Sequence, residues 1–216
     1  PSRCSKVAGS NGWISNTRLP GWRPKTERDE ERSTMNRIRH CGFALCGLIL
    51  LGGLASAEMI SGLEVGAPTV SIPVLDVTGA YAGKRICYVC EFQDDPNVLA
   101  FFRDTGDATA DLIIQLNELY LERKDENFKA VAAIVAGEEA APWLEALNAR
   151  ANIEIPLVVL RRGPKDVAVR LYALNPEVDN TFLVTVNRFV SANVSAIEPD
   201  QFDQVVEATA QMLAGL

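Results

Sequence analysis

The strongest constraint on the fold of this chain comes from three short apolar runs, at residues 97–102, 128–135 and 153–160. Each run is bounded by turn residues, and its apolar side chains follow one another with little alternation. Runs of this kind predict strands that are buried on both faces of a sheet. Because both faces then need a cover, the sequence predicts a central sheet between two layers of other elements.

Segments with helical spacing lie between these runs and after them. Residues 107–124 repeat apolar side chains at helical intervals, with Asp107 as the expected N-cap. A second helix is predicted at 138–151, and a last one from Pro199 onward. The alternation of strands and helices indicates an α/β fold rather than two separate all-α and all-β parts.

Additional strands are predicted at 69–76, 167–172 and 182–190. Pro73 fits an edge position for the first of these strands, because proline cannot donate to a sheet ladder. The other two follow one another without a helix between them, which implies an antiparallel edge. The whole pattern therefore predicts a central mixed β-sheet flanked by helices.

This order of elements resembles the thioredoxin fold in its redoxin form. The resemblance is carried by Gly-Leu-Glu-Val-Gly-Ala-Pro at 62–68, by the buried run at 98–102 with a helix after it, and by Asn-Ile-Glu-Ile-Pro-Leu-Val-Val-Leu at 152–160. It implies a thioredoxin-like three-layer domain at residues 58–216. In this family a cis-proline before the third core strand faces the active site, and Pro156 matches that place. The same stretches, with a Cys-Tyr-x-Cys run, resemble exported redoxin-like proteins of planctomycete-type bacteria.

The resemblance also implies an active-site position that holds no cysteine in this chain. Thioredoxins carry Cys-x-x-Cys after the first core strand, at the start of the next helix. Here residues 103–108 read Arg-Asp-Thr-Gly-Asp-Ala, and the chain's own pair, Cys87 and Cys90, precedes the strand. The family's catalytic residues therefore do not transfer by position. Peroxidase chemistry, which would want a cysteine shortly after that strand, is not expected.

The pair Cys87 and Cys90 is nevertheless the motif with the clearest chemical potential. Its two-residue spacing occurs in disulfide oxidoreductases and in half of a zinc site. A disulfide requires Cα atoms about 4.4–6.8 Å apart, whereas residues three apart in a straight strand lie about 10 Å apart. The pair can therefore close only if the chain bends at Tyr88 and Val89.

The residues leave four interpretations of this pair open. The first is a redox-active dithiol, in which Cys87 is expected to attack and Cys90 to resolve, with Lys84 and Arg85 favouring a thiolate and Glu91 opposing it. The second is a structural disulfide, as is common in exported domains. The third is a metal-binding dithiol, which needs ligands beyond two thiolates. The fourth is a redoxin-like binding or scaffold module without catalysis.

Residues 35–57 have the features of a secretory signal. Basic residues follow Met35, a short apolar stretch covers 43–54, and Ala-Ser-Ala at 55–57 provides a cleavage site. The apolar stretch is shorter than the roughly 20 residues that span a bilayer. We expect export to the periplasm or the extracellular space, with membrane attachment only if the signal stays uncleaved. Residues 1–34 are polar and are expected to be disordered or a mis-called upstream extension.

Charge and composition limit the partners of residues 58–216. The chain has 21 Lys and Arg and 28 Asp and Glu, of which residues 1–57 hold 9 and 4, so that 12 basic and 24 acidic residues and a formal charge of −12 remain. Such acidity disfavours nucleic acid and anionic membranes as partners. The one histidine, His40, lies in the signal segment, and no glycine loop for phosphate is present. We therefore expect exported protein thiols or disulfides as partners and no cofactor. Metal binding and the oligomeric state stay open.

Overall fold

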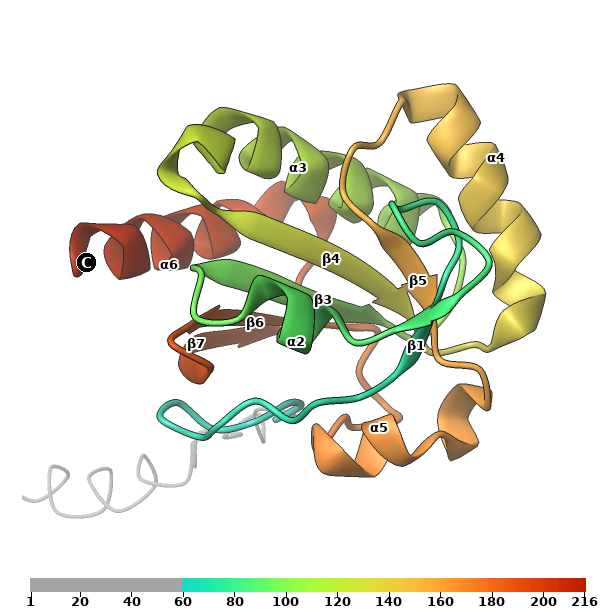
Figure 1. The fold of residues 1–216 in the computed structure, drawn as a ribbon, viewed down its shortest axis with the longest axis horizontal. Helices are drawn as coiled ribbons and strands as arrows, with labels where there is room; N and C mark the ends of the chain where they lie inside the picture. The colour runs from blue at the N-terminus through green and yellow to red at the C-terminus, as the bar shows by residue number, and fades with distance from the viewer. Residues whose placement is uncertain (1–59) are drawn as a thin grey trace, which may run out of the picture. The chain divides into compact units, whose positions relative to one another are not determined.

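The computed structural model describes residues 60–216, and in this part of the chain the three apolar runs form neighbouring strands of a seven-stranded mixed sheet (Figure 1). The strands are β1 (Val74–Asp76), β2 (Arg85–Ile86), β3 (Asn97–Phe102), β4 (Lys129–Ile134), β5 (Leu157–Val159), β6 (Asn180–Val186) and β7 (Phe189–Ser195). They are ordered β2-β1-β5-β4-β3-β6-β7 across the sheet.

Parallel pairing of β3 with β4, and of β4 with β5, makes the centre of the sheet. Leu99 lies opposite Val131, and Ala133 lies opposite Val158. On one side β6 runs antiparallel to β3 and β7 antiparallel to β6, so the predicted antiparallel edge is confirmed. On the other side β1 runs antiparallel to both β5 and β2. The sheet is therefore mixed, as the sequence predicts.

Helices cover both faces of this sheet, which confirms the predicted three-layer α/β architecture. The α-helices are α2 (Tyr88–Phe92), α3 (Asp107–Arg123), α4 (Ala141–Ala151), α5 (Val167–Leu171) and α6 (Asp203–Ala214), with short 3-10 turns at Lys124–Glu126, Glu138–Ala140, Gly163–Lys165 and Pro199–Gln201. Buried side chains of α3, α4 and α6 pack on the face that carries Val98 and Phe102. Those of α2 and α5 pack on the opposite face, which carries Leu99 and Phe101 (Figure 1).

The prediction of a strand at 167–172 is wrong, because this segment forms the short helix α5. The side chain of Asp166 accepts a hydrogen bond from the backbone N–H of Ala168 at 3.1 Å, which caps the start of the helix. Val167 and Leu171 are 46% and 37% exposed, while Ala168 is buried against the sheet. Val167 and Val169, which suggested a strand, thus lie in a short helix, and this helix needs to bury only one side against the sheet.

The prediction of one strand at 182–190 is also wrong, because the chain reverses inside it. β6 and β7 form a hairpin with Asn187 and Arg188 as its two-residue turn. Both residues have positive φ, 52° and 65°. Such a turn has the twist that joins antiparallel strands tightly. Arginine at the second turn position hid the turn, because glycine is the usual residue there.

Two smaller expectations also change. The strand predicted at 69–76 is limited to β1, which lies between β2 and β5 and is not an edge strand. Pro73 precedes β1 and so removes no hydrogen bond from its ladder. The N-cap of α3 is Gly106, and Asp107 is the first helical residue, so the predicted Asp107 cap is wrong.

The predictions made for residues 1–57, and the predicted domain boundary at residue 58, lie outside the described residues. Within residues 60–216, no helix has both the length and the apolar character needed to cross a membrane.

Candidate functional site

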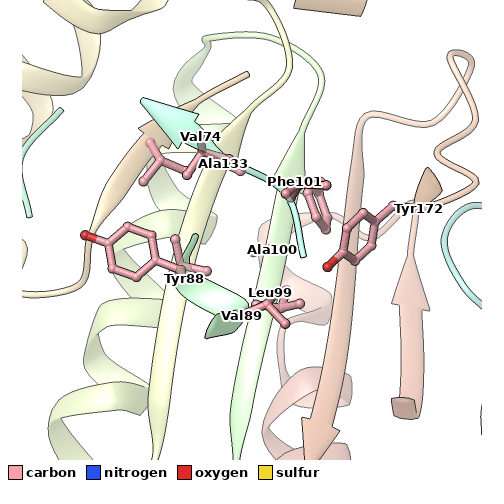
Figure 2. A pocket seen from close by; sticks show the side chains of 11 residues that line it. Val74, Tyr88, Val89, Leu99, Ala100, Phe101, Ala133 and Tyr172 are labelled. Carbon is pink, nitrogen blue, oxygen red and sulfur yellow. The ribbon is translucent and has the colours of Figure 1, made fainter. Parts of the chain in front are cut away.

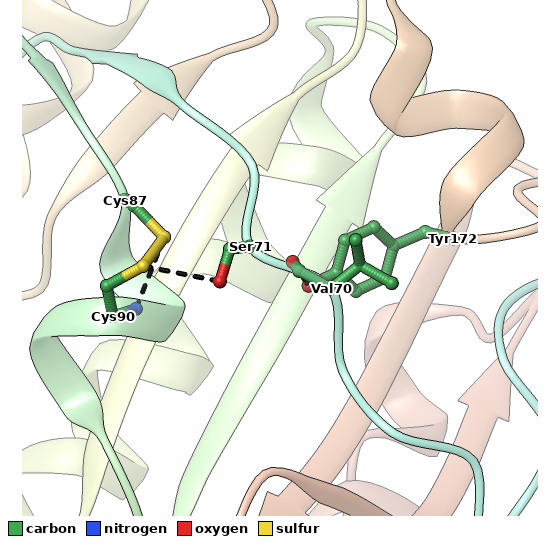
Figure 3. The surroundings of a disulfide bond; sticks show 5 residues. All are labelled: Val70, Ser71, Cys87, Cys90 and Tyr172. Atoms are coloured by element: carbon green, nitrogen blue, oxygen red, sulfur yellow. Dashed lines mark hydrogen bonds between the residues drawn. A yellow bond between two sulfur atoms is a disulfide. The ribbon is translucent and has the colours of Figure 1, made fainter.

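The cysteine pair lies where β2 ends and α2 begins, and the chain bends there as the disulfide geometry requires. Cys87 keeps an extended backbone, with φ −109° and ψ 99°, and is the N-cap of α2. The helix then turns Cys90 back toward Cys87, so that their Cα atoms are 5.2 Å apart and the sulfurs are joined (Figure 3). This separation lies inside the range for a disulfide. The strand preference of Tyr88 and Val89 is overridden at this point.

The two sulfur atoms have different surroundings. The Sγ of Cys87 accepts a hydrogen bond from the backbone N–H of Cys90 at 3.3 Å. The Sγ of Cys90 lies 3.3 Å from the hydroxyl oxygen of Ser71 (Figure 3). A disulfide sulfur carries no hydrogen, so in the oxidised form the Ser71 hydroxyl is the donor. Cys90 and Ser71 are exposed residues, whereas Cys87 is half-buried.

Apolar packing fixes α2 against the sheet. Tyr88, Val89 and Phe92 are 6%, 8% and 8% exposed, respectively, so one side of this short helix is buried. Val89 and Leu99 line a small apolar cavity of about 30 Å³. Figure 2 shows the side chains that line it. The residue types between the cysteines are therefore explained by burial.

A buried carboxylate holds the same helix by a polar contact. Asp76 is fully buried and accepts a 2.7 Å hydrogen bond from the hydroxyl of Tyr88. The backbone N–H groups of Gly79 and Tyr81 donate to the same carboxylate at 2.7 and 2.8 Å. Burial, followed by the hydrogen bond to Asp76, raises the pKa of Tyr88 well above its usual range. Tyr88 thus stays a neutral donor, and Asp76 has three donors to offset its loss of water.

Two further hydrogen bonds connect this region to its surroundings. The hydroxyl of Tyr81 donates to Glu91 at 2.7 Å, on the exposed side of α2. The hydroxyl of Tyr172, at the end of α5, donates to the backbone oxygen of Val70 at 2.6 Å. Val70 precedes Ser71, so this bond holds the segment that lies against Cys90 (Figure 3).

Comparison with solved structures places this fold in a known class. Peroxidoxin BcpB of Mycobacterium tuberculosis superposes with a TM-score of 0.56 at 16% identity, covering 71% of this chain and 98% of that one. The thioredoxin domain of a thiol-disulfide oxidoreductase from Bacteroides vulgatus superposes with a TM-score of 0.53 at 14% identity. The match covers 67% of this chain and 96% of that one. Peroxiredoxin Q of Xanthomonas campestris superposes with a TM-score of 0.52 at 14% identity, and the match covers 71% of this chain and 98% of that one. The fold is thioredoxin-like. No protein-family model matches the chain, and no curated protein sequence matches it significantly.

The cysteine pair does not lie in the loop after β3. The strands β1, β5 and β4 separate β2, which leads to Cys87, from β3. The loop after β3 contains Arg103, which is paired with Asp179, and it holds no cysteine. A cavity of about 390 Å³ at this place is lined by several acidic side chains, among them Asp104 and Asp107. Nothing in this loop can perform thiol chemistry.

The structure does not bring Pro156 to the cysteine pair. Pro156 lies just before β5, and its backbone oxygen accepts a hydrogen bond from Ala132 at 3.1 Å. The register pairs Leu75 of β1 with Val159, near the end of β5, while Cys87 follows the end of β2 beside the start of β1. Pro156 and the disulfide therefore lie at opposite ends of β1. The role of Pro156 as an active-site proline stays a prediction that rests on the resemblance.

Within residues 60–216, no metal-ligating side chains are grouped with Cys87 and Cys90 into a possible metal site. Among residues 60–216 no cluster of three or more His, Cys, Asp or Glu side chains is arranged to hold a metal ion. Within the described part of the chain, the two sulfurs would need ligands from elsewhere to complete a tetrahedral site.

Sequence reasoning missed Ser71 and Asp76. Asp76 begins the run Asp-Val-Thr-Gly, a pattern typical of turns, and its carboxylate accepts a hydrogen bond from the N–H of Gly79 three residues on. Its contact with Tyr88 is a tertiary one that this signal does not include. Ser71 has no signal in the sequence, because its contact with Cys90 joins residues 19 apart through the packing of a loop.

Proposed function

We propose that Cys87 and Cys90 are a redox-active pair that exchanges disulfides with the thiols of other proteins. The observation that carries this proposal is the exposure of Cys90 in a disulfide at the surface of a thioredoxin-like fold. Exchange needs a thiolate to approach a disulfide sulfur directly, so an accessible sulfur is its first requirement. A disulfide that only cross-links the chain has no such requirement.

The reaction proceeds in two steps and transfers two electrons. A partner thiolate attacks one sulfur of the pair, the Cys87–Cys90 bond breaks, and the other cysteine leaves as a thiolate. A second partner thiolate then attacks the partner's own sulfur in the mixed disulfide, which releases the second cysteine. The partner thiols are oxidised to a disulfide and the pair is reduced to two thiols. The reverse sequence reduces a partner disulfide, and the potential of the pair decides the direction.

The compartment of this reaction follows from the signal-like residues 35–57, which support a proposal of export. In the periplasm or outside the cell, protein thiols and disulfides coexist and can serve as partners. Peroxide reduction is not part of the proposal, although two of the similar structures are a peroxidoxin and a peroxiredoxin. The loop after β3 holds no cysteine for that chemistry.

A turnover assay tests the proposal. Catalytic amounts of the protein are added to a peptide disulfide with glutathione as the reductant, and peptide reduction is followed. We expect the protein to raise the rate, and the double variant Cys87→Ser, Cys90→Ser to match the rate without protein. This variant keeps Cys4, Cys41 and Cys46, so it controls for thiols elsewhere in the chain. A wild-type rate equal to that of the double variant would overturn the proposal and leave a structural disulfide.

A further inference from the structure

We infer that Cys90 is the sulfur that forms the mixed disulfide with the partner, that Cys87 is the resolving cysteine, and that Ser71 contacts the exchanging sulfur. This assignment rests on the proposed exchange function. It reverses the order expected from the sequence, in which the first cysteine of the pair attacks.

Access to the sulfurs is the first reason. A thiolate attacks a disulfide sulfur along the axis of the S–S bond, so solvent must reach the attacked atom. Cys90 is an exposed residue, and Cys87 is half-buried. Cys87 is followed directly by Tyr88, which is 6% exposed and whose hydroxyl donates to Asp76. The open side of the disulfide is therefore the Cys90 side.

The second reason is the fate of the leaving thiolate. When Cys90 is attacked, the electron pair of the S–S bond goes to the Sγ of Cys87. That sulfur already accepts a hydrogen bond from the backbone N–H of Cys90 at 3.3 Å. A hydrogen bond to a charged acceptor is stronger than one to a neutral acceptor, so the bond stabilises the thiolate as it forms. Thiols with a lower pKa leave faster in this exchange.

Ser71 provides the corresponding contact for Cys90. Its hydroxyl oxygen is 3.3 Å from the Sγ of Cys90 and can donate to that sulfur whenever it is a thiolate. This state occurs when reduced Cys90 attacks a partner disulfide, and when Cys90 is released from the mixed disulfide. Tyr172 supports the contact, because it binds the backbone oxygen of Val70 beside Ser71. Both cysteines thus have a donor, and Cys90 is the more exposed of the two.

The full-length wild-type protein allows a direct test. The oxidised protein is mixed with glutathione as the probe, quenched with acid and digested with trypsin. Cleavage after Arg85 and Arg103 yields residues 86–103, which contain both cysteines of the pair and none of the other three. Fragment masses then show which cysteine carries glutathione. We expect about tenfold more glutathione on Cys90 than on Cys87, and a similar amount on each in denaturant, where access is equal.

Single variants provide an independent measurement. Reduced Cys87→Ser protein, which keeps Cys90, should form a glutathione adduct with glutathione disulfide about tenfold faster than Cys90→Ser protein, which keeps Cys87. An excess of adduct on Cys87 in the wild type would overturn the assignment while leaving exchange through the pair intact. A wild-type disulfide that glutathione does not open, together with variants no more reactive than free cysteine, would instead overturn the exchange function itself.

Discussion

The hydroxyl of Tyr88 donates a 2.7 Å hydrogen bond to the fully buried carboxylate of Asp76. This contact joins Tyr88, the first of the two residues between the cysteines, to β1, across an interval of 12 residues. Because Tyr88 is the first residue of α2, its position fixes where the helix begins and hence where Cys87 and Cys90 lie. Cys90 is exposed, but Tyr88 between the cysteines is anchored in the core.

The first prediction concerns the Tyr88 hydroxyl. Replacing Tyr88 with Phe keeps the ring but removes one of the three donors to Asp76, so the free energy of unfolding should fall by about 1.5–3 kcal/mol. Urea unfolding of the oxidised protein measures the change. Tyr81→Phe is the matched control, because it removes only an exposed hydrogen bond to Glu91 and should change stability much less than Tyr88→Phe does. Equal effects of the two variants would contradict the account of Asp76.

The second prediction concerns Gly79, which lies against the same contact. A Cβ atom there would come within 2.6 Å of the Tyr88 hydroxyl and 2.7 Å of an Asp76 oxygen. Gly79→Ala should therefore destabilise the protein by about 1–3 kcal/mol through overpacking. Gly215→Ala is the control, since its Cβ would meet its nearest neighbour at an ordinary 3.5 Å. Thermal unfolding of both variants checks the prediction. The prediction fails if Gly79→Ala has the same melting temperature as the wild type.

The third prediction concerns alkaline pH. Burial raises the pKa of Tyr172, and burial with the Asp76 hydrogen bond raises that of Tyr88, above the ordinary value of about 10. The unfolded chain therefore loses these protons at a lower pH than the folded chain. Stability from these groups is complete below about pH 10 and falls as the pH rises above it. Urea unfolding across this range should show the decline, and Tyr88→Phe should make it shallower. If the slope of stability against pH is unchanged in that variant, the contribution assigned to Tyr88 is wrong.

The fourth prediction concerns Ser71. In a Cys87→Ser background, alkylation of Cys90 at neutral pH reports how much of it is thiolate. Ser71→Ala should slow this alkylation about threefold to tenfold, because a hydrogen bond of about 1 kcal/mol to the thiolate is lost. Ser71→Thr, which keeps the hydroxyl, should restore the rate. The contact has no role if alanine and threonine give the same rate as serine.

The central strands and the class of fold could be predicted from the sequence, because burial on both faces of a sheet gives continuous apolar runs. The helix α5 could not, since Val167 and Val169 fit a strand equally well and the cap from Asp166 decided the outcome. The turn at Asn187 and Arg188 could not be predicted either, because both residues adopt positive φ although neither is glycine, the usual signal of such a turn.

The site could be predicted in part. The spacing of Cys87 and Cys90 required a bend, and the structure provides it through α2. Which sulfur is exposed could not be derived, because that depends on how α2 packs against the sheet. Ser71 and Asp76 reach the site only through tertiary packing, and local sequence patterns do not predict contacts between residues this far apart.

The reduction potential of the Cys87–Cys90 pair tests the central claim most directly. The full-length protein is equilibrated in glutathione buffers and alkylated, and the tryptic peptide of residues 86–103 is weighed by mass spectrometry. A redox-active pair predicts a reversible two-electron transition between roughly −270 and −120 mV, the range of known disulfide oxidoreductases. A pair that stays oxidised below about −300 mV would contradict the account and identify the disulfide as structural.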